Sequence, residues 1–303
     1  MARQGTDYSD VSVIIPTIEE EAVFKLINQI RSMLKDAEII VVDKSSNAYY
    51  GRLEDTGVKV IRQRTRGVEN AIMLGLRAAK GKILASIDAD GTHDPEGLVQ
   101  GVKLIRAGEA DLVLGDRLAN LEKGSMSVYL RMGNSMLSGL FSRIYGTKVR
   151  DVLTGLFVMD RVAFDEIRNK EPYRAGIAFF AIELARRGYV IKEVGIKYYK
   201  RPYGESKLTR SKTAYGLNVA SHIIRQLRDY SPLLVFGGFG FVVFLVGLAL
   251  GIVVLADFAK TGLFTLSGRA LLAIMLIIVG FLMGVVGLII DMLLELERKL
   301  DSR

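Results

Sequence analysis

Residues 83–95 read ILASIDADGTHDP, and this stretch decides the fold prediction. A short aliphatic run at 83–87 ends at Asp88, Asp90 follows two residues later, and Pro95 opens a helical pattern. Proline is favoured at the first position of a helix. A strand that passes through a polar loop into a helix is typical of a βαβ unit. The loop of such a unit lies at the carboxyl edge of the sheet, where ligands bind.

The same alternation of short β-branched runs and helical patterns extends from residue 10 to residue 115. Strands are predicted at 11–15, 39–42, 59–61, 83–87 and 112–114, and helices at 20–34, 67–79 and 95–107. Strands that alternate with helices predict an α/β fold with a mainly parallel sheet. The residues expected at its ligand-binding edge are those that follow the strands, at 16–20, 43–46, 88–93 and 115–117.

Several carboxylates occupy these strand ends. Asp88 and Asp90 supply the hard oxygen ligands that suit Mg²⁺ or Mn²⁺ bound together with substrate phosphates. The alternative is that both aspartates only cap their loop. Asp43 follows a strand and is placed to accept hydrogen bonds from a nucleobase or a ribose. The chain has no Cys and only two His, which excludes thiolate chemistry and disfavours a histidine metal site.

The net charge of +8 points to an anionic partner, which residue composition alone leaves open among phosphates, nucleic acid and an acidic lipid surface. Residues 231–303 carry five basic and five acidic residues, so the excess lies wholly in residues 1–230. Arg117, Arg201 and Lys207 are the cations best placed to contact a phosphate. The chain lacks a Walker lysine motif and a Gly-x-Gly-x-x-Gly after a strand, which disfavours ATPase-type and dinucleotide binding.

Two uncharged segments, 233–255 and 270–290, are long enough to span a membrane, whereas two buried core helices are the less favoured alternative. Basic residues flank the pair at 225, 228, 298 and 299, so the positive-inside rule places both flanks in the cytoplasm and loop 256–269 outside. Two further stretches are amphipathic and basic. Residues 211–230 favour a helix in the headgroup layer, and residues 125–145 fit that layer and the domain core equally well.

Six motifs follow one another between residues 11 and 208. They are Ile14-Ile15-Pro16-Thr17-x-x-Glu20, Val41-Val42-Asp43-x-Ser45, Asp88-Ala89-Asp90-x-x-His93-x-Pro95, Gly115-x-Arg117, Asp151-x-x-Thr154-Gly155 and Arg201-x-x-Gly204-x-Ser206-Lys207-Leu208. In these motifs the chain resembles the family-two inverting glycosyltransferases, which have a Rossmann-like GT-A fold. Within them it is similar to the polyprenyl- and dolichyl-phosphate hexosyltransferases. It departs from their pattern at Glu19, Lys44 and Phe157.

The resemblance implies a role for each matching residue. The donor nucleotide is expected at Pro16, Thr17, Glu20, Asp43, Asp88, Ala89, Arg201 and Lys207. A Mg²⁺ or Mn²⁺ ion is expected at Asp88, Asp90 and Thr92. The residues implied to be catalytic are Asp90, Arg117, Arg131 and Asp151, with Arg131 contacting the acceptor phosphate and Asp151 acting either as a base or as an orienting group.

The resemblance also implies an activity, which is inverting transfer of a hexose from a nucleotide sugar, GDP-mannose before a UDP-hexose, to a polyprenyl or dolichyl phosphate. Non-processive transfer to a lipid-linked glycan is the alternative, whereas the processive relatives use a Gln-x-x-Arg-Trp motif and this chain has no Trp. A cytoplasmic catalytic domain is expected at 1–210, a juxtamembrane amphipathic helix at 211–231 and a two-helix membrane domain with a short cytoplasmic tail at 232–303. The partners are then the two substrates and the bilayer, without nucleic acid.

Overall fold

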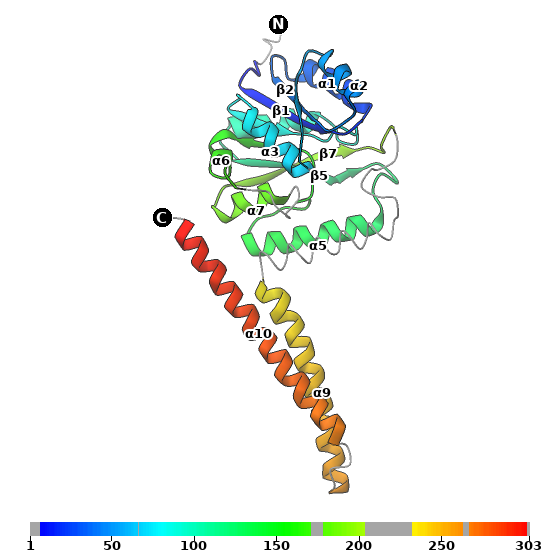
Figure 1. Cartoon of the computed structure of the whole chain (residues 1–303), viewed down its shortest axis with the longest axis vertical. Helices are drawn as coiled ribbons and strands as arrows, with labels where there is room; N and C mark the ends of the chain where they lie inside the picture. Colours follow the sequence, from blue (N-terminus) through cyan, green and yellow to red (C-terminus); the bar gives the residue numbers. More distant parts are fainter. Residues whose placement is uncertain (1–6, 66, 171–177, 204–231, 263–266, 302–303) are drawn as a thin grey trace. The chain divides into compact units, whose positions relative to one another are not determined.

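The computed structural model describes residues 7–65, 67–170, 178–203, 232–262 and 267–301. The chain divides into two compact units, Met1–Val219 and Ala220–Arg303, which are described separately (Figure 1). Lys207, the basic flank at 225 and 228, and the amphipathic segment predicted at 211–231 lie outside the described residues.

The first unit is an α/β domain. Its strands are β1 (Val11–Thr17), β2 (Glu38–Asp43), β3 (Lys59–Arg62), β4 (Ile83–Ser86), β5 (Leu112–Leu121), β6 (Phe157–Asp160) and β7 (Ile191–Tyr198). Its helices are α1 (Ala22–Met33), α2 (Asn47–Glu54), α3 (Val68–Ala78), α4 (Glu96–Arg106), α5 (Val128–Tyr145), α6 (Arg161–Asp165) and α7 (Ala178–Arg186). The predicted α/β fold with a mainly parallel sheet is confirmed.

The seven strands form one sheet in the order β3-β2-β1-β4-β6-β5-β7. Strands β1 to β4 are mutually parallel, β6 runs antiparallel to both β4 and β5, and β7 is parallel to β5. The carboxyl ends of six strands and the amino end of β6 therefore meet at one edge. The strand order reverses between β1 and β4, which is where an open α/β sheet places its ligand crevice.

Helices cover both faces of the sheet. Val13 and Ile15 of β1 belong to a core shared with α1 and α4. Ile14 points to the other face, where Gly75 of α3 packs so closely that a methyl group at this glycine would overlap the Ile14 side chain. All seven residues of β1 are buried, as expected for a strand covered on both faces. This double coverage fixes the loops that follow β1 and β4.

The structure adds to the predicted elements and corrects one of them. Helix α2 and strands β6 and β7 were not predicted; β6 has only four residues, whereas the alternating apolar residues of β7 were overlooked. Arg117 was predicted to end its strand, but β5 continues to Leu121. Pairing with β7 allows this extension, with a shift in register between Asp116 and Asn120. Arg117 thus lies within β5 at the irregular part of the pairing, which bends the strand locally.

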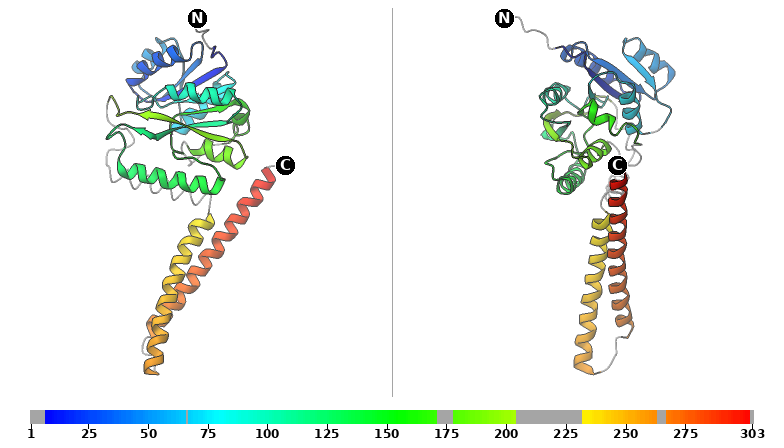
Figure 2. Two further views of the ribbon diagram at one scale, coloured as in Figure 1. Left: turned by 180° about the vertical axis from the view of Figure 1, so that it is seen from behind. Right: turned by 90° about the vertical axis from the view of Figure 1, so that its left-hand side faces the viewer.

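The second unit contains the short helix η1 (Leu233–Gly237) and two long helices, α9 (Gly238–Thr261) and α10 (Ser267–Asp301), which lie side by side (Figure 2). Both predicted apolar segments are helical, and Val235–Thr261 and Gly268–Leu296 are long and apolar enough to cross a membrane. The two helices meet at small residues, with Gly240 against Gly280 and Gly247 against Ile277. Glycine permits this close backbone approach, while most of the large apolar side chains face outward.

Candidate active site

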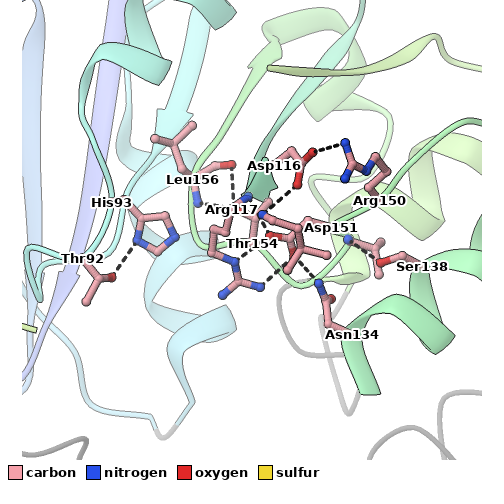
Figure 3. A network of polar contacts seen from close by, with 12 residues as sticks. Thr92, His93, Asp116, Arg117, Asn134, Ser138, Arg150, Asp151, Thr154 and Leu156 are labelled. Atoms are coloured by element: carbon pink, nitrogen blue, oxygen red, sulfur yellow. Dashed lines mark hydrogen bonds and ion pairs between the residues drawn. The ribbon is translucent and has the colours of Figure 1, made fainter. Parts of the chain in front are cut away.

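The loop after β4 carries the two aspartates of the predicted metal site. Thr92 folds back on Asp90, to whose Oδ1 it donates from its backbone N–H at 3.1 Å and from its hydroxyl at 2.7 Å. Gly91 has φ +72°, a conformation that glycine adopts without strain and that permits this turn. The Thr92 hydroxyl also lies 3.1 Å from Nδ1 of His93 (Figure 3). Asp90 and Thr92, two of the predicted ligands, are therefore in direct contact.

Asp88 lies deeper at the same edge, next to the buried Ala89. Burial raises the pKa of Asp88 to about 7, and the negative charge of Asp90 raises it further, whereas Arg117 and Arg201 act in the opposite direction. The pKa of His93 falls to about 4, chiefly through burial and next through Arg117, so the imidazole is neutral at pH 7. The site thus holds two carboxylates whose mutual repulsion a cation would relieve.

These side chains fit a divalent ion whose remaining ligands come from the substrate. Asp88, Asp90 and the Thr92 hydroxyl offer hard oxygen atoms. Within the described parts of the chain, no three His, Asp or Glu side chains gather as a metal-binding group. Mg²⁺ is commonly held by only one or two carboxylates together with substrate phosphates, and it retains several water molecules. The residues therefore fit such an ion as a partial set of ligands that substrate phosphates would complete.

The loop before β6 lies against the carboxylate of Asp88. Because β6 is antiparallel to β4, its first residue Phe157 pairs with Ser86, and the preceding Gly155 arrives beside Asp88. A methyl group on Gly155 would overlap the carboxylate of Asp88. The absence of a side chain at Gly155 therefore makes the room in which the Asp88 carboxylate lies.

A buried ion pair links β5 to the loop that carries Asp151. Arg117 donates from Nε to Oδ2 and from Nη2 to Oδ1 of Asp151, both at 2.7 Å, and its backbone N–H donates to Oδ2 at 3.0 Å (Figure 3). Burial acts to raise the pKa of Asp151, but the charge of Arg117 and its hydrogen bonds hold it below the usual value. Since both oxygens are engaged and the side chain is fully buried, this geometry favours an orienting role for Asp151.

The ends of β1 and β7 are joined by a second ion pair. Arg201 Nη2 lies 2.6 Å from Oε1 of Glu20, and both side chains are mostly buried. Sequence alone did not choose between Glu19 and Glu20 as the ligand-facing acid. Glu19 instead turns toward the next loop, where its backbone N–H donates to the hydroxyl of Ser45 and its carboxylate accepts from the N–H of Ser46. Glu20 is therefore the acid brought close to the aspartates.

Asp43 lies beside the end of β1, where Thr17 pairs with it and Pro16 pairs with Val42. The carboxylate of Asp43 is fully buried and accepts hydrogen bonds from Ser45 and from Arg62, whose Nη1 lies 3.3 Å from Oδ2. The guanidinium of Arg62 in turn stacks 4.2 Å from the ring centre of Tyr50. Asp43 is therefore held in place by protein groups at the sheet edge.

Arg131 is exposed on α5, and among the described residues its side chain makes no hydrogen bond or ion pair. Of the two cations predicted near residues 200–208, Arg201 and Lys207, only Arg201 lies within the described residues. Sequence reasoning missed three residues that contact the predicted site, Asn134, Glu193 and Tyr198. Tyr198 stacks edge-on against His93, and Arg117 lies 5.6 Å from the centre of its ring. The alternating apolar residues of 191–198 were the available signal, because a strand predicted there would have brought Tyr198 to the ligand edge.

Comparison with known proteins identifies the family. The family model described as glycosyl transferase family 2 matches residues 12–168, which is about half of the chain and contains Asp88, Asp90, Arg117 and Asp151. The chain belongs to glycosyltransferase family 2. The predicted resemblance is thereby confirmed at the level of the family.

Several curated relatives are similar in sequence. Glycosyltransferase AglJ of Haloferax volcanii is 26% identical over 296 residues, which cover 97% of this chain and 96% of the relative. The low-salt glycan biosynthesis hexosyltransferase Agl6 of the same organism is 28% identical over 205 residues, covering 65% of this chain but only 49% of the relative. The undecaprenyl-phosphate mannosyltransferase of Micrococcus luteus is 29% identical over 222 residues, covering 66% of this chain and 87% of the relative.

A solved structure supports the fold. Glucosyl-3-phosphoglycerate synthase from Mycobacterium tuberculosis, in complex with Mn²⁺, uridine diphosphate and phosphoglyceric acid, matches with a TM-score of 0.51 at 18% identity. The match covers 71% of this chain and 78% of that one. At this identity the likeness concerns the fold alone, and it confirms the GT-A fold of the first unit.

Replacing Gly155 by Ala is expected to lower glycosyl transfer about a hundredfold, because the added methyl group displaces the Asp88 carboxylate by the order of an ångström. The control is Gly51→Ala on α2, where the added methyl group meets open space. Both variants are compared by nucleotide-sugar turnover and by thermal unfolding. Wild-type turnover in a folded Gly155→Ala variant would contradict the role given to this contact.

Proposed function

We propose that this protein is a metal-dependent hexosyltransferase that transfers a hexose, with inversion, from a nucleotide sugar to the phosphate of a polyprenyl or dolichyl carrier. One observation carries the proposal. Two mutually repelling carboxylates, Asp88 and Asp90, lie at the same sheet edge as the guanidinium of Arg117, which is paired with Asp151. Acidic and basic groups side by side suit a donor diphosphate and an acceptor phosphate. The similarity to a relative named undecaprenyl-phosphate mannosyltransferase supports the lipid acceptor.

The proposed donor site comprises the residues at the ends of β1, β2 and β4 and the basic segment after β7. These residues are Pro16, Thr17, Glu20, Asp43, Asp88, Ala89, Arg201 and Lys207. A Mg²⁺ or Mn²⁺ ion held by Asp88 and Asp90 beside Thr92 would neutralise the charge that grows on the leaving nucleotide. Arg201 is paired with Glu20. We propose that a phosphate of the donor competes with Glu20 for the guanidinium of Arg201. We propose GDP-mannose as the first choice of donor and a UDP-hexose as the second.

The acceptor side needs orientation more than proton transfer. A phosphomonoester has a second pKa near about 6, so the carrier phosphate is already largely anionic at neutral pH. Arg117 binds the Asp151 carboxylate through Nε and Nη2, and among the described residues its Nη1 makes no hydrogen bond, so we propose Nη1 as the contact for the acceptor. Arg131 is proposed as the second phosphate contact. Holding the acceptor in line with the anomeric carbon supplies a large part of the rate enhancement.

Helix α5 is proposed to lie in the lipid headgroup layer. Its outward residues include Tyr129, Met132 and Met136, which are 84%, 66% and 67% exposed, together with the cations Arg131 and Arg143. An apolar face of this kind, bordered by Arg, is typical of a helix that lies on a membrane. The exposure of these side chains supports the interfacial interpretation of residues 125–145, which would bring Arg131 to the level of a lipid phosphate.

The domain organisation follows from the same proposal. We propose that residues 1–210 belong to the catalytic domain and residues 232–303 to a two-helix membrane domain; the juxtamembrane helix predicted at 211–231 lies outside the described residues. The chain is then an integral membrane protein with the catalytic domain and both termini in the cytoplasm. A non-processive transferase acting on a lipid-linked glycan is the second candidate, which the similarity to a hexosyltransferase of glycan biosynthesis favours.

Purified full-length protein, incubated with Mg²⁺ or Mn²⁺, undecaprenyl or dolichyl phosphate and a panel of GDP- and UDP-hexoses, is expected to form one lipid-phosphate-sugar. Chelation by EDTA is expected to abolish the reaction, and Asp90→Ala is expected to do so without lowering the unfolding temperature. Product is measured by mass spectrometry of the lipid fraction. Transfer only to a lipid-linked glycan would select the second candidate, and full activity in EDTA would remove the metal from the proposal.

Arg131→Ala is expected to reduce transfer to polyprenyl phosphate about ten- to a hundredfold, the cost of losing a charge-assisted contact, with nucleotide affinity unchanged. Arg131→Lys restores part of the rate, because Lys lacks the two-pronged grip of Arg. The matched control is Arg143→Ala, which removes an equal charge from the other end of α5. Rates are measured in detergent with a short prenyl phosphate. Equal losses of transfer rate in both variants would indicate that Arg131 contacts lipid in general and does not bind the acceptor phosphate specifically.

The orientation is testable with single cysteines, because the natural chain has none. In intact cells that express the protein, a membrane-impermeant thiol reagent is expected to label Thr261→Cys, at the end of α9, and to spare Lys35→Cys, on the surface of the catalytic unit. Permeabilised cells should show labelling at both positions. The reverse pattern in intact cells would invert the proposed topology.

A further inference from the structure

The inner face of α5 carries three polar side chains at positions 134, 138 and 142, which lie on one side of the helix because they are four residues apart. Asn134 donates from Nδ2 to Oδ1 of Asp151 at 2.8 Å. Ser138 accepts the N–H of Val152 at 3.0 Å. Ser142 donates to the carbonyl and accepts the N–H of Val149, at 2.8 and 3.0 Å. Together they hold the 149–152 segment along the helix.

Of these three side chains, only Asn134 touches the carboxylate of Asp151 (Figure 3). It binds Oδ1, the oxygen that also accepts the Nη2 of Arg117. Ser138 and Ser142 reach only backbone atoms. The backbone of Asp151 is fixed independently by Glu193, which accepts the N–H groups of Arg150 and Asp151 at 2.8 to 2.9 Å. Loss of Asn134 would therefore leave the segment in place and remove one hydrogen bond from the carboxylate, whose remaining donors among the described residues all belong to Arg117.

The orientation of that carboxylate matters for Arg117. The terminal torsion of an aspartate side chain has a broad energy profile, so hydrogen bonds determine the plane in which its oxygens lie. A two-pronged pair with Arg requires the guanidinium to share this plane. Asn134 thus helps to fix the orientation of Arg117 through Asp151, and among the described residues it makes no hydrogen bond to the guanidinium itself.

The side chain of Asn134 is 3% exposed, and its Oδ1 has no hydrogen-bond partner among the described residues. An unsatisfied buried acceptor lowers stability, and an apolar residue of similar volume would avoid this cost. The Oδ1 atom therefore does not explain an amide at this position. The hydrogen bond to Asp151 explains the amide, because this bond requires a donor beside a buried carboxylate.

We propose that Asn134 is a positioning residue of the transfer reaction, which fixes the Asp151 carboxylate and through it the face that Arg117 presents to the acceptor phosphate. This inference rests on the proposed function, in which Arg117 binds that phosphate. Because Asn134 stands one turn after Arg131 on α5, a single helix then contributes one acceptor contact directly and sets the other through Asp151.

The test is a double-mutant cycle in the full-length protein with Asn134→Ala, Arg117→Lys and the double variant. Asn134→Ala alone is expected to lower kcat/KM for farnesyl phosphate about tenfold or more, with nucleotide affinity, measured by calorimetry, unchanged. In the Arg117→Lys background the same change is expected to cost less than about threefold, since the fork that Asn134 orients is absent. Coupling of this kind reports an interaction between the sites.

Ser142→Ala is the matched control, because it loosens the same segment from the same helix face without touching Asp151, and near wild-type rates are expected. If Asn134→Ala does not fold, Asn134→Leu, which keeps the branched shape of the side chain without its polar atoms, replaces it. Equal losses from Asn134→Ala in both backgrounds, or an equal loss in Ser142→Ala, would overturn the proposal. If wild-type protein does not use farnesyl phosphate, the proposed function fails separately, and the cycle is then measured on the acceptor that it does use, or on nucleotide-sugar hydrolysis.

Discussion

The direction of β6 is the constraint on which the site depends. The strand runs against its neighbours β4 and β5, so its amino end joins the carboxyl ends of the other strands at one edge. Gly155 thereby reaches Asp88, and the Asp151 loop reaches Arg117. A parallel β6 would carry this loop to the opposite edge of the sheet. One strand reversal thus assembles carboxylates from β4 with a cation from β5.

The electrostatics of the edge follow from that assembly. Asp88 is partly buried beside a second carboxylate and has a raised pKa, whereas the fully buried Asp151 is paired with Arg117 and has a lowered pKa. Two aspartates of the same chain thus differ in character because of what faces them. The carboxylate of Asp88, which is repelled by that of Asp90, is suited to a bound cation and a diphosphate. The paired one is suited to orienting its arginine, which agrees with the proposal for the acceptor side.

Helix α5 and the apolar helix pair give the chain two features suited to a lipid substrate. Along α5, apolar and basic side chains face outward while Asn134 and Ser138 face the Asp151 loop. In the second unit, glycines allow α9 and α10 to pack closely and leave large apolar side chains outside. Each unit thus has an outward apolar surface of its own, in keeping with a glycosyltransferase whose acceptor resides in a bilayer.

The sequence by itself determined the α/β class, the apolar helix pair and the strand-end aspartates, because hydrophobic periodicity and strand–loop–helix order are local properties. It also led to the family, through motifs that keep their order along the chain. Only the tertiary structure decided that Asp43 and Glu20 have protein partners, that β5 extends past Arg117, and that Asn134 meets Asp151. These features arise from contacts between residues that pairing, strand direction and helix packing bring together, and no local pattern encodes them.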